Sequence, residues 1–197
     1  MHSCSQEGSP DWRRRFEARV ETAGPTTTEV ALLAQTPDTT ARTSPLTDVD
    51  LLVDEIRAPR AAGKVVDDCG DPVSFGARRM IDGDESTAWR MRGDGTGRTV
   101  VLELEGPRRV HSVGLVPGYD AVACDGTDQF TASRRITEVT WEFDDGTRVR
   151  QDLIDLATLQ RIDVDATTTR ILLHIDGVTA DPDQDYTALS ELVVRGV

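Results

Sequence analysis

Residues 80–92 read M-I-D-G-D-E-S-T-A-W-R-M-R. This stretch places an Asp-Gly turn and a group of short oxygen-bearing side chains just ahead of Trp89; the group comprises Asp82, Asp84, Ser86 and Thr87. Carboxylate, hydroxyl and carbonyl oxygens wound around a glycine suit a hard cation such as Ca²⁺. One loop rarely completes such a shell, and Glu191, in the closing run T-A-L-S-E-L-V-V, is the candidate for the missing ligand. By residue type alone, an acidic surface turn is the simpler interpretation.

The bulk composition limits the classes of protein to consider. The chain has 197 residues, of which 38% are hydrophobic and 29% charged, and its formal net charge is −13. This length suits one well-buried domain with an extension. The negative charge argues against a nucleic-acid partner, because binding a phosphate backbone needs a field of Lys and Arg. We expect no transmembrane segment, because no apolar run is long enough to cross a bilayer as a helix, and no signal peptide is visible.

The cysteines argue against a zinc site. There are three of them, Cys4, Cys69 and Cys124, and none belongs to a C-x-x-C pair, so a zinc site is not expected. Cys69 and Cys124 both lie in loops rich in Gly and Asp. They form either a disulfide, if their Cα atoms come close enough, or a pair of free thiols.

Composition divides the chain into two parts. A cap at Asp11 and apolar side chains spaced four residues apart predict a short helix near the start. Residues 21–47 are rich in Thr, Pro, Ser and Ala, which is typical of a flexible tether. We therefore expect a helix and tether over residues 1–47 and a folded domain over residues 48–197.

The second part carries a series of strand patterns. The predicted strands are 51–56, 99–104, 110–116, 136–143, 147–153, 160–164, 169–175 and 189–194. In residues 136–143, Val139, Trp141 and Phe143 alternate with polar residues, as in a half-buried strand. Asp144-Asp145-Gly146 is a hairpin signal. Many short strands without a helix pattern between them predict an all-β fold, an antiparallel β-sandwich.

Loop residues with polar tips are the candidates for ligand binding. They are Tyr119, Asp128, Phe130, Arg134, Arg135 and Tyr186. Arginine binds sugar hydroxyls or carboxylates through two parallel N–H groups, and aromatic rings provide a stacking face. For the two arginines, salt bridges to Asp120, Asp125 or Asp128 are an equally good interpretation. Trp89 and Trp141 could also stack on sugars, but their positions favour the core.

No catalytic motif stands out. Ser190 is not surrounded by G-x-S-x-G, and G-D-G-T-G at residues 93–97 lacks the lysine and the following helix of a phosphate loop. An acidic domain always offers carboxylate pairs, so a hydrolase stays as a remote alternative.

In their order along the chain, these pieces resemble a known family. The pieces are Phe75-Gly76, the 80–90 motif, G-D-G-T-G (93–97), V-G-L-V-P-G-Y (113–119), D-G-T-D-Q-F (125–130), S-R-R-I-T-E-V-T-W-E-F-D-D-G (133–146), Leu159-Gln160 and T-A-L-S-E-L-V-V (187–194). Together they resemble a discoidin-like (coagulation-factor type C, galactose-binding) jelly roll. The resemblance is closest to the bacterial NADase-type glycan-binding domain and covers about residues 48–197. The chain departs from the usual G-Y-A-K and N-R-R at residues 118–121 and 133–135.

The resemblance implies a structural Ca²⁺ that joins the two ends of the domain. Side chains of Asp82 and Glu191 would bind the ion, together with the hydroxyl and carbonyl of Thr87. Backbone oxygens would come from Arg79, Asp84 and Ser190.

The resemblance also implies a function. It predicts a non-catalytic carbohydrate-binding module that anchors its bearer to a glycan or another surface ligand, outside the cell or on its surface. The alternatives are a protein-interaction or adhesion module on the same fold and, more remotely, a hydrolase with unrecognised carboxylates.

Overall fold

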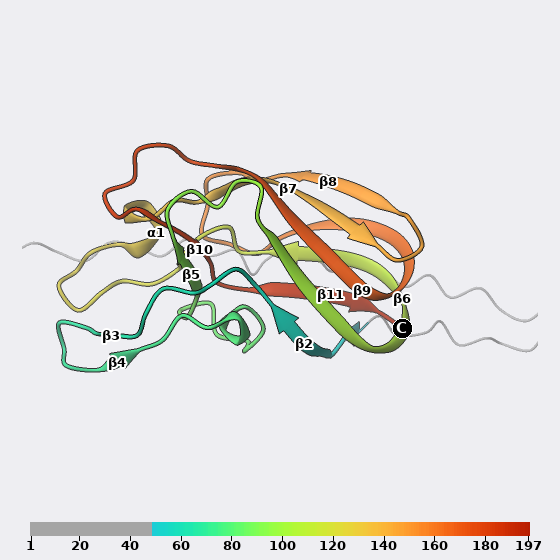
Figure 1. Cartoon of the computed structure of the whole chain (residues 1–197), viewed down its shortest axis with the longest axis horizontal. Helices are drawn as coiled ribbons and strands as arrows, with labels where there is room; N and C mark the ends of the chain where they lie inside the picture. Colours follow the sequence, from blue (N-terminus) through green and yellow to red (C-terminus); the bar gives the residue numbers. More distant parts are fainter. Residues whose placement is uncertain (1–48) are drawn as a thin grey trace, which may run out of the picture. The chain divides into compact units, whose positions relative to one another are not determined.

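The computed structural model describes residues 49–197, so the helix and tether predicted for residues 1–47 lie outside the described residues. The elements in chain order are β1 (Val49–Asp50), β2 (Val53–Arg57), β3 (Val65–Val66), β4 (Pro72–Val73), the 3₁₀ helix η1 (Ala77–Met80), β5 (Trp89–Arg92), β6 (Thr99–Leu115), α1 (Gln129–Ala132), β7 (Ile136–Phe143), β8 (Arg148–Asp152), β9 (Gln160–Val178), β10 (Tyr186–Leu189) and β11 (Leu192–Gly196) (Figure 1). The predicted all-β, antiparallel jelly-roll sandwich is confirmed.

Two long strands, β6 and β9, form the centre of the sandwich. They pair with each other along most of their length, and the ladder breaks where β6 passes from Glu103 to Arg108. On one side of this break β2 lies beside β6 and β7 lies beside β9; on the other side β11 lies beside β6. The strands curve over between the two halves (Figure 1). The prediction of separate strands at 99–104 and 110–116, and at 160–164 and 169–175, is wrong, because each pair continues through the bend.

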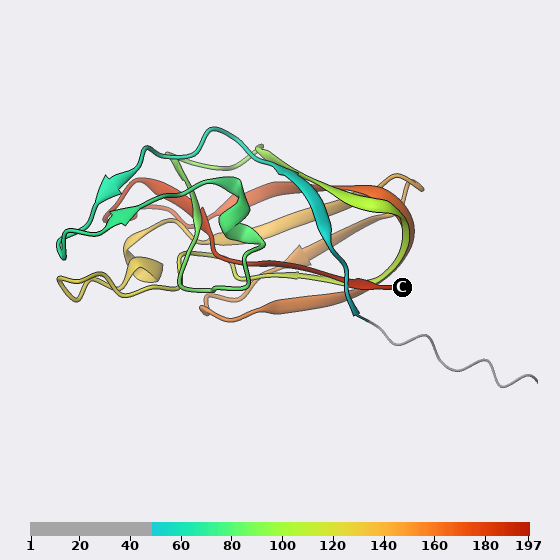
Figure 2. The same ribbon diagram turned by 90° about the horizontal axis from the view of Figure 1, so that it is seen from below.

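The smaller sheets lie at the end of the domain opposite the C-terminus. The seven-stranded main sheet runs β1-β11-β6-β9-β7-β8 with β2 added on β6, while β10 pairs with β5 and β3 with β4. Figures 1 and 2 both place the β3–β4 hairpin and α1 together at this end. We call it the loop end. The sequence predicted no helix between the strands of residues 48–197. The structure has two short ones there, η1 and α1, so this prediction is wrong.

The core lies between the two halves of the bent strands. Trp89 and Trp141 are both fully buried, at 0% exposure. Their indole N–H groups donate to Pro59 O (3.1 Å) and to Gln151 Oε1 (2.9 Å). Val139 and Phe143 are buried on the same face of β7 as Trp141. Both tryptophans are therefore core residues, as expected, and neither is a sugar platform.

The predicted strand 189–194 is divided. Leu189 ends β10, which pairs with β5, and Leu192 begins β11, which pairs with β6. The chain changes partners between them, so Ser190 and Glu191 belong to neither ladder. This break frees Glu191 to turn toward the 80–87 loop.

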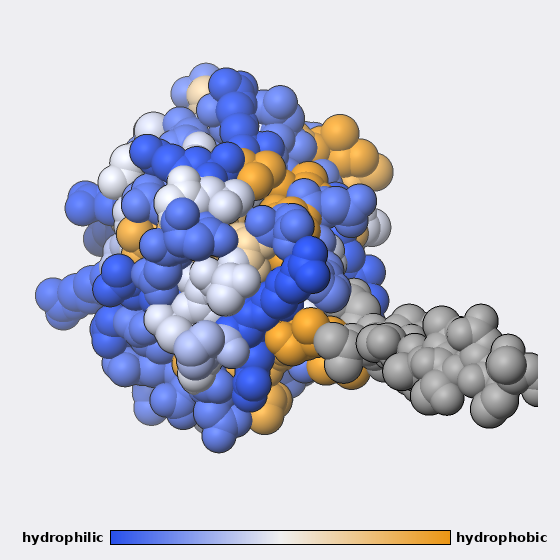
Figure 3. Space-filling model, turned by 90° about the vertical axis from the view of Figure 1, so that its right-hand side faces the viewer, coloured by the Kyte–Doolittle hydropathy of each residue, from blue (hydrophilic) through white to orange (hydrophobic). Residues whose placement is uncertain are grey.

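The end that carries the C-terminus is mostly hydrophilic, and its hydrophobic residues gather toward one side (Figure 3). Among the described residues, no helix has the length and apolar character needed to span a membrane.

Candidate functional site

The acidic loop gathers oxygen atoms around the hydroxyl of Thr87. Thr87 Oγ1 lies 2.9 and 3.1 Å from the two carboxylate oxygens of Asp82, 3.2 Å from Asp84 O and 3.4 Å from Arg79 O. Four of the six predicted calcium ligands therefore meet at one point. The turn is tight because Gly83 has φ +74°, which favours glycine.

Glu191, which lies 108 residues after Gly83 in the sequence, contacts the same loop. Its Oε2 accepts a hydrogen bond from Gly83 N at 3.1 Å, and the residue is only 7% exposed. Burial and then the negative charge of Asp82 raise the pKa of Glu191 to about 7. The structure thus brings Asp82 and Glu191 together, as the resemblance implies.

The donor set fits Ca²⁺. It consists of oxygen atoms only and combines two carboxylates with a hydroxyl and two carbonyls. The guanidinium of Arg79, 3.2 Å from Asp82 Oδ2, balances part of the negative charge that a bound cation would neutralise. Ser190 is fully buried, and its Oγ accepts a hydrogen bond from Asp120 N at 3.0 Å. That the backbone carbonyl of Ser190 binds the ion stays a prediction.

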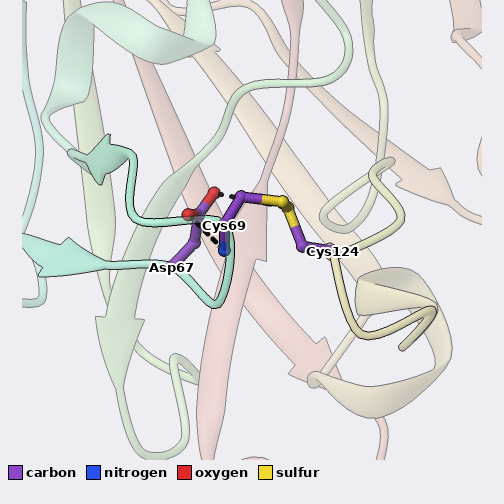
Figure 4. Close-up of side chains that lie close together, drawn as sticks. All are labelled: Asp67, Cys69 and Cys124. Atoms are coloured by element: carbon purple, nitrogen blue, oxygen red, sulfur yellow. Dashed lines mark hydrogen bonds between the residues drawn. A yellow bond between two sulfur atoms is a disulfide. The ribbon is translucent and has the colours of Figure 1, made fainter.

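A disulfide fixes the loop end. Cys69 and Cys124 are bonded, with their Cα atoms 5.8 Å apart, which joins the β3–β4 turn to the loop before α1 (Figure 4). Asp67 lies beside them and accepts a hydrogen bond from Cys69 N at 3.0 Å. These three side chains are close enough to hold a metal, but sulfurs bonded to each other offer no thiolate. Of the two states left open by the sequence, the disulfide is the one present.

A pocket of about 400 Å³ opens beside the disulfide. Its wall combines Phe75, Arg90 and Tyr119 with the amides of Gln129 and Gln184. The mouth carries Val66 and Val122, which are 70% and 73% exposed.

Arg90 is the most unusual residue of this wall. It is 7% exposed, and its guanidinium carbon lies 3.9 Å from the ring centroid of Phe75 and 4.2 Å from that of Tyr186. Nη1 lies 3.5 Å from Gln184 Oε1, and Nε, fully buried, has no partner. Burial lowers the pKa of Arg90 below its ordinary value.

The six predicted ligand residues do not gather in one place. Tyr119 lines the pocket, and the ring centroid of Tyr186 lies 4.2 Å from the guanidinium carbon of Arg90. Asp128 caps α1 by accepting a hydrogen bond from Phe130 N at 3.0 Å. Phe130 is only 7% exposed and does not line this pocket, and its role as a stacking face stays a prediction.

Arg134 and Arg135 fix loops. Arg134 pairs with Asp185 at 3.0 Å and Arg135 with Asp155 at 2.7 Å, so neither uses the three aspartates expected as partners. The sequence interpretation missed Arg90, although it stands in the quoted motif, because nothing local shows that two distant rings enclose it.

A family model matches most of the domain. The model of the NAD glycohydrolase translocation F5/8 type C domain aligns with residues 63–195. No curated protein matches the chain.

Similar solved structures include several carbohydrate-binding modules. A truncated AlyQ with CBM32 and alginate lyase domains has a TM-score of 0.53 at 14% identity, covering 77% of this chain and 34% of that one. The CBM32-1 and CBM32-2 domains of Clostridium perfringens ZmpB, in complex with GalNAc, have a TM-score of 0.51 at 11% identity, covering 74% and 33%. CBM32-3 from a family 31 glycoside hydrolase of Clostridium perfringens has a TM-score of 0.50 at 14% identity, covering 72% and 91%. The chain thus spans about a third of the first two, and at these identities the likeness concerns the fold.

Proposed function

The chain belongs to the family of NAD glycohydrolase translocation F5/8 type C domains, and from this premise we propose that it is a non-catalytic carbohydrate-binding module. It would hold its bearer against a glycan outside the cell or on its surface. The described disulfide fits such an oxidising location.

The pocket at the loop end is the observation that carries this proposal. Its volume of about 400 Å³ lies in the range of small-molecule sites, about 300–1,000 Å³. The walls offer the partly exposed ring of Tyr119 beside the amides Gln129 and Gln184, while Phe75, 3% exposed, supports Arg90 from behind. Sugars present apolar C–H faces and hydroxyl edges, and this mixture of surfaces matches both. A single site of this kind would bind at roughly millimolar Kd and gain by multivalency.

We further propose that a Ca²⁺ ion joins the acidic loop to Glu191 and acts on stability alone. Asp82 and Glu191 would supply charge, Thr87 a hydroxyl, and Arg79, Asp84 and Ser190 backbone oxygens. An ion bound only by the folded state adds to the free energy of unfolding, by about 2.7 kcal/mol at a hundred times its Kd.

A protein-binding module is the second candidate. Val66 and Val122 are large hydrophobic residues exposed at the pocket mouth, and such residues suit a protein partner as well as a sugar. Under this alternative the loop end would contact a protein, and the pocket would take one of its side chains.

A glycan array with the full chain, run with and without calcium, tests the proposal. We expect binding to a restricted set of glycans. Binding should be lost when Ala121, a pocket-lining residue of intermediate exposure, is changed to Trp. Ala157→Trp, at a loop alanine of similar exposure outside this pocket, is the matched control and should bind normally.

The outcomes separate the candidates. An array on which no sugar is bound would overturn the carbohydrate-binding proposal. Binding to a purified protein partner that Ala121→Trp blocks would then favour the second candidate. Turnover of any glycan would contradict the non-catalytic role.

A further inference from the structure

Arg90 is a buried positive charge without a negative partner. Within residues 49–197 it forms no ion pair, although its neighbours Arg134 and Arg135 each pair with an aspartate. Its exposure is 7%, and its Nε has no hydrogen-bond partner. A buried charge that lacks a partner destabilises a fold, so such a group calls for an explanation.

Two aromatic rings hold the guanidinium in place. Phe75 and Tyr186 lie 3.9 and 4.2 Å from its central carbon, and the cation–π attraction partly offsets the loss of water. The rings accept no conventional hydrogen bond, so the five N–H donors of the guanidinium still need oxygen partners. One of them meets Gln184 Oε1 at the long distance of 3.5 Å. Arg90 lines the pocket, and because its Nε is fully buried, the donors available to a ligand there are the terminal Nη groups, whose one protein partner is this long contact.

We propose that this pocket binds an acidic sugar, a uronic-acid type residue whose carboxylate accepts hydrogen bonds from Arg90. The inference rests on the proposed function and adds the chemical class of the glycan. The two coplanar oxygens of a carboxylate match two parallel N–H groups of a guanidinium.

The charges around the pocket favour a carboxylate over a phosphate. Asp67 and Asp68 also line it, and they would repel a second negative charge on the ligand. Both carboxylate oxygens of Asp67 lie against the Cys69–Asp71 turn or the disulfide, so Asp68, which is exposed, is the better acceptor for sugar hydroxyls. A sugar with one carboxylate and several hydroxyls can accept hydrogen bonds from Arg90 and donate them to Asp68.

Matched sugar pairs test this inference on the unaltered full chain. The probes are the methyl glycosides of galacturonic, glucuronic and mannuronic acid, each beside its uncharged methyl ester and its neutral parent hexose, titrated by calorimetry at constant calcium. We expect at least one acid to bind about 10- to 100-fold more tightly than its ester, which is the factor for hydrogen bonds to a charged group. Added salt should narrow this difference.

Variants locate the effect at Arg90. Arg90→Gln should remove the preference for the acid, and Arg90→Lys should keep part of it. Arg148→Gln, at an exposed arginine outside the pocket, should leave it unchanged. Melting temperatures of all variants separate loss of binding from loss of folding.

Three results would overturn the inference. Neutral hexoses bound as tightly as the acids would leave the carbohydrate-binding function standing and remove the acidic-sugar preference. Binding of inorganic sulfate or phosphate that depends on Arg90, without binding of any acid sugar, would identify a different anion. Absence of binding to all sugars, here and on the array, would remove the function and the inference together.

Discussion

Glu191 accepts a hydrogen bond from the backbone N–H of Gly83 at 3.1 Å. This contact joins the loop that follows η1 to the break between β10 and β11, and it places two carboxylates, Glu191 and Asp82, in the same small space. When both carboxylates are ionised, their repulsion destabilises the fold. A proton on Glu191 or a bound cation removes this repulsion.

Without calcium, stability should fall as pH rises. The pKa of Glu191 in the folded state is about 7, above the ordinary glutamate value of 4.5, so the fold favours the protonated form. The loss of stability caused by ionising Glu191 is therefore absent below pH 4.5, grows between pH 4.5 and 7, and is constant above pH 7. Glu191→Gln should raise the free energy of unfolding by about 1–2 kcal/mol at pH 8 in chelator, and have little effect at pH 4.5. Urea denaturation at the two pH values measures it, and an equal effect at both would contradict the assignment.

Calcium should raise the melting temperature, and Asp82→Asn should abolish the rise. Asp82 would contribute its carboxylate to the ion, whereas Asp84 would contribute only its backbone oxygen. Asp84→Asn is therefore the matched control and should keep most of the calcium effect. Scanning calorimetry in calcium and in chelator gives both values. Equal melting temperatures for the unaltered chain in the two solutions would rule the ion out.

Sequence patterns predicted features that depend on near neighbours. The alternation of Val139, Trp141 and Phe143 predicted a half-buried strand, and Asp144-Asp145-Gly146 predicted the turn after it, where Gly146 has φ +88°. Gly106-Pro107, which lies between the predicted strands 99–104 and 110–116, indicated a turn and misled for the same reason. A Gly-Pro pair is a local turn signal, but pairing with β9 on both sides of the bend carries β6 through it.

The candidate site depends on contacts that no local pattern contains. The meeting of Glu191 with the acidic loop followed from the family resemblance, and calcium binding there stays a prediction. The environment of Arg90 requires Phe75 and Tyr186, which precede and follow it by many residues, to converge on one side chain. Phe130 appeared to be a loop aromatic, yet α1 turns it inward.

Loss of the disulfide should weaken the loop end. Cys69 and Cys124 are 55 residues apart in the sequence, and a cross-link of this kind contributes about 2–4 kcal/mol, mainly by restricting the unfolded chain. We expect Cys69→Ser/Cys124→Ser to lower the free energy of unfolding by this amount and to weaken ligand binding, because both loops line the pocket. Cys4→Ser is the control and should change neither quantity. Identical denaturation curves with and without reductant would contradict this role.

Gly118 should tolerate no side chain, because a Cβ there would lie 2.6 Å from Cδ2 of the Phe130 ring. Gly118→Ala should cost about 1–3 kcal/mol of stability, as overpacking does elsewhere in protein cores. It should also weaken ligand binding more than the loss of stability explains, because Tyr119, the next residue, lines the pocket. Gly63→Ala, where a Cβ would meet nothing within 4 Å, is the matched control and should leave both stability and binding nearly unchanged. Denaturation and sugar titration of the two variants decide the matter: if Gly118→Ala behaves like Gly63→Ala, the packing of Phe130 does not set the position of the pocket wall.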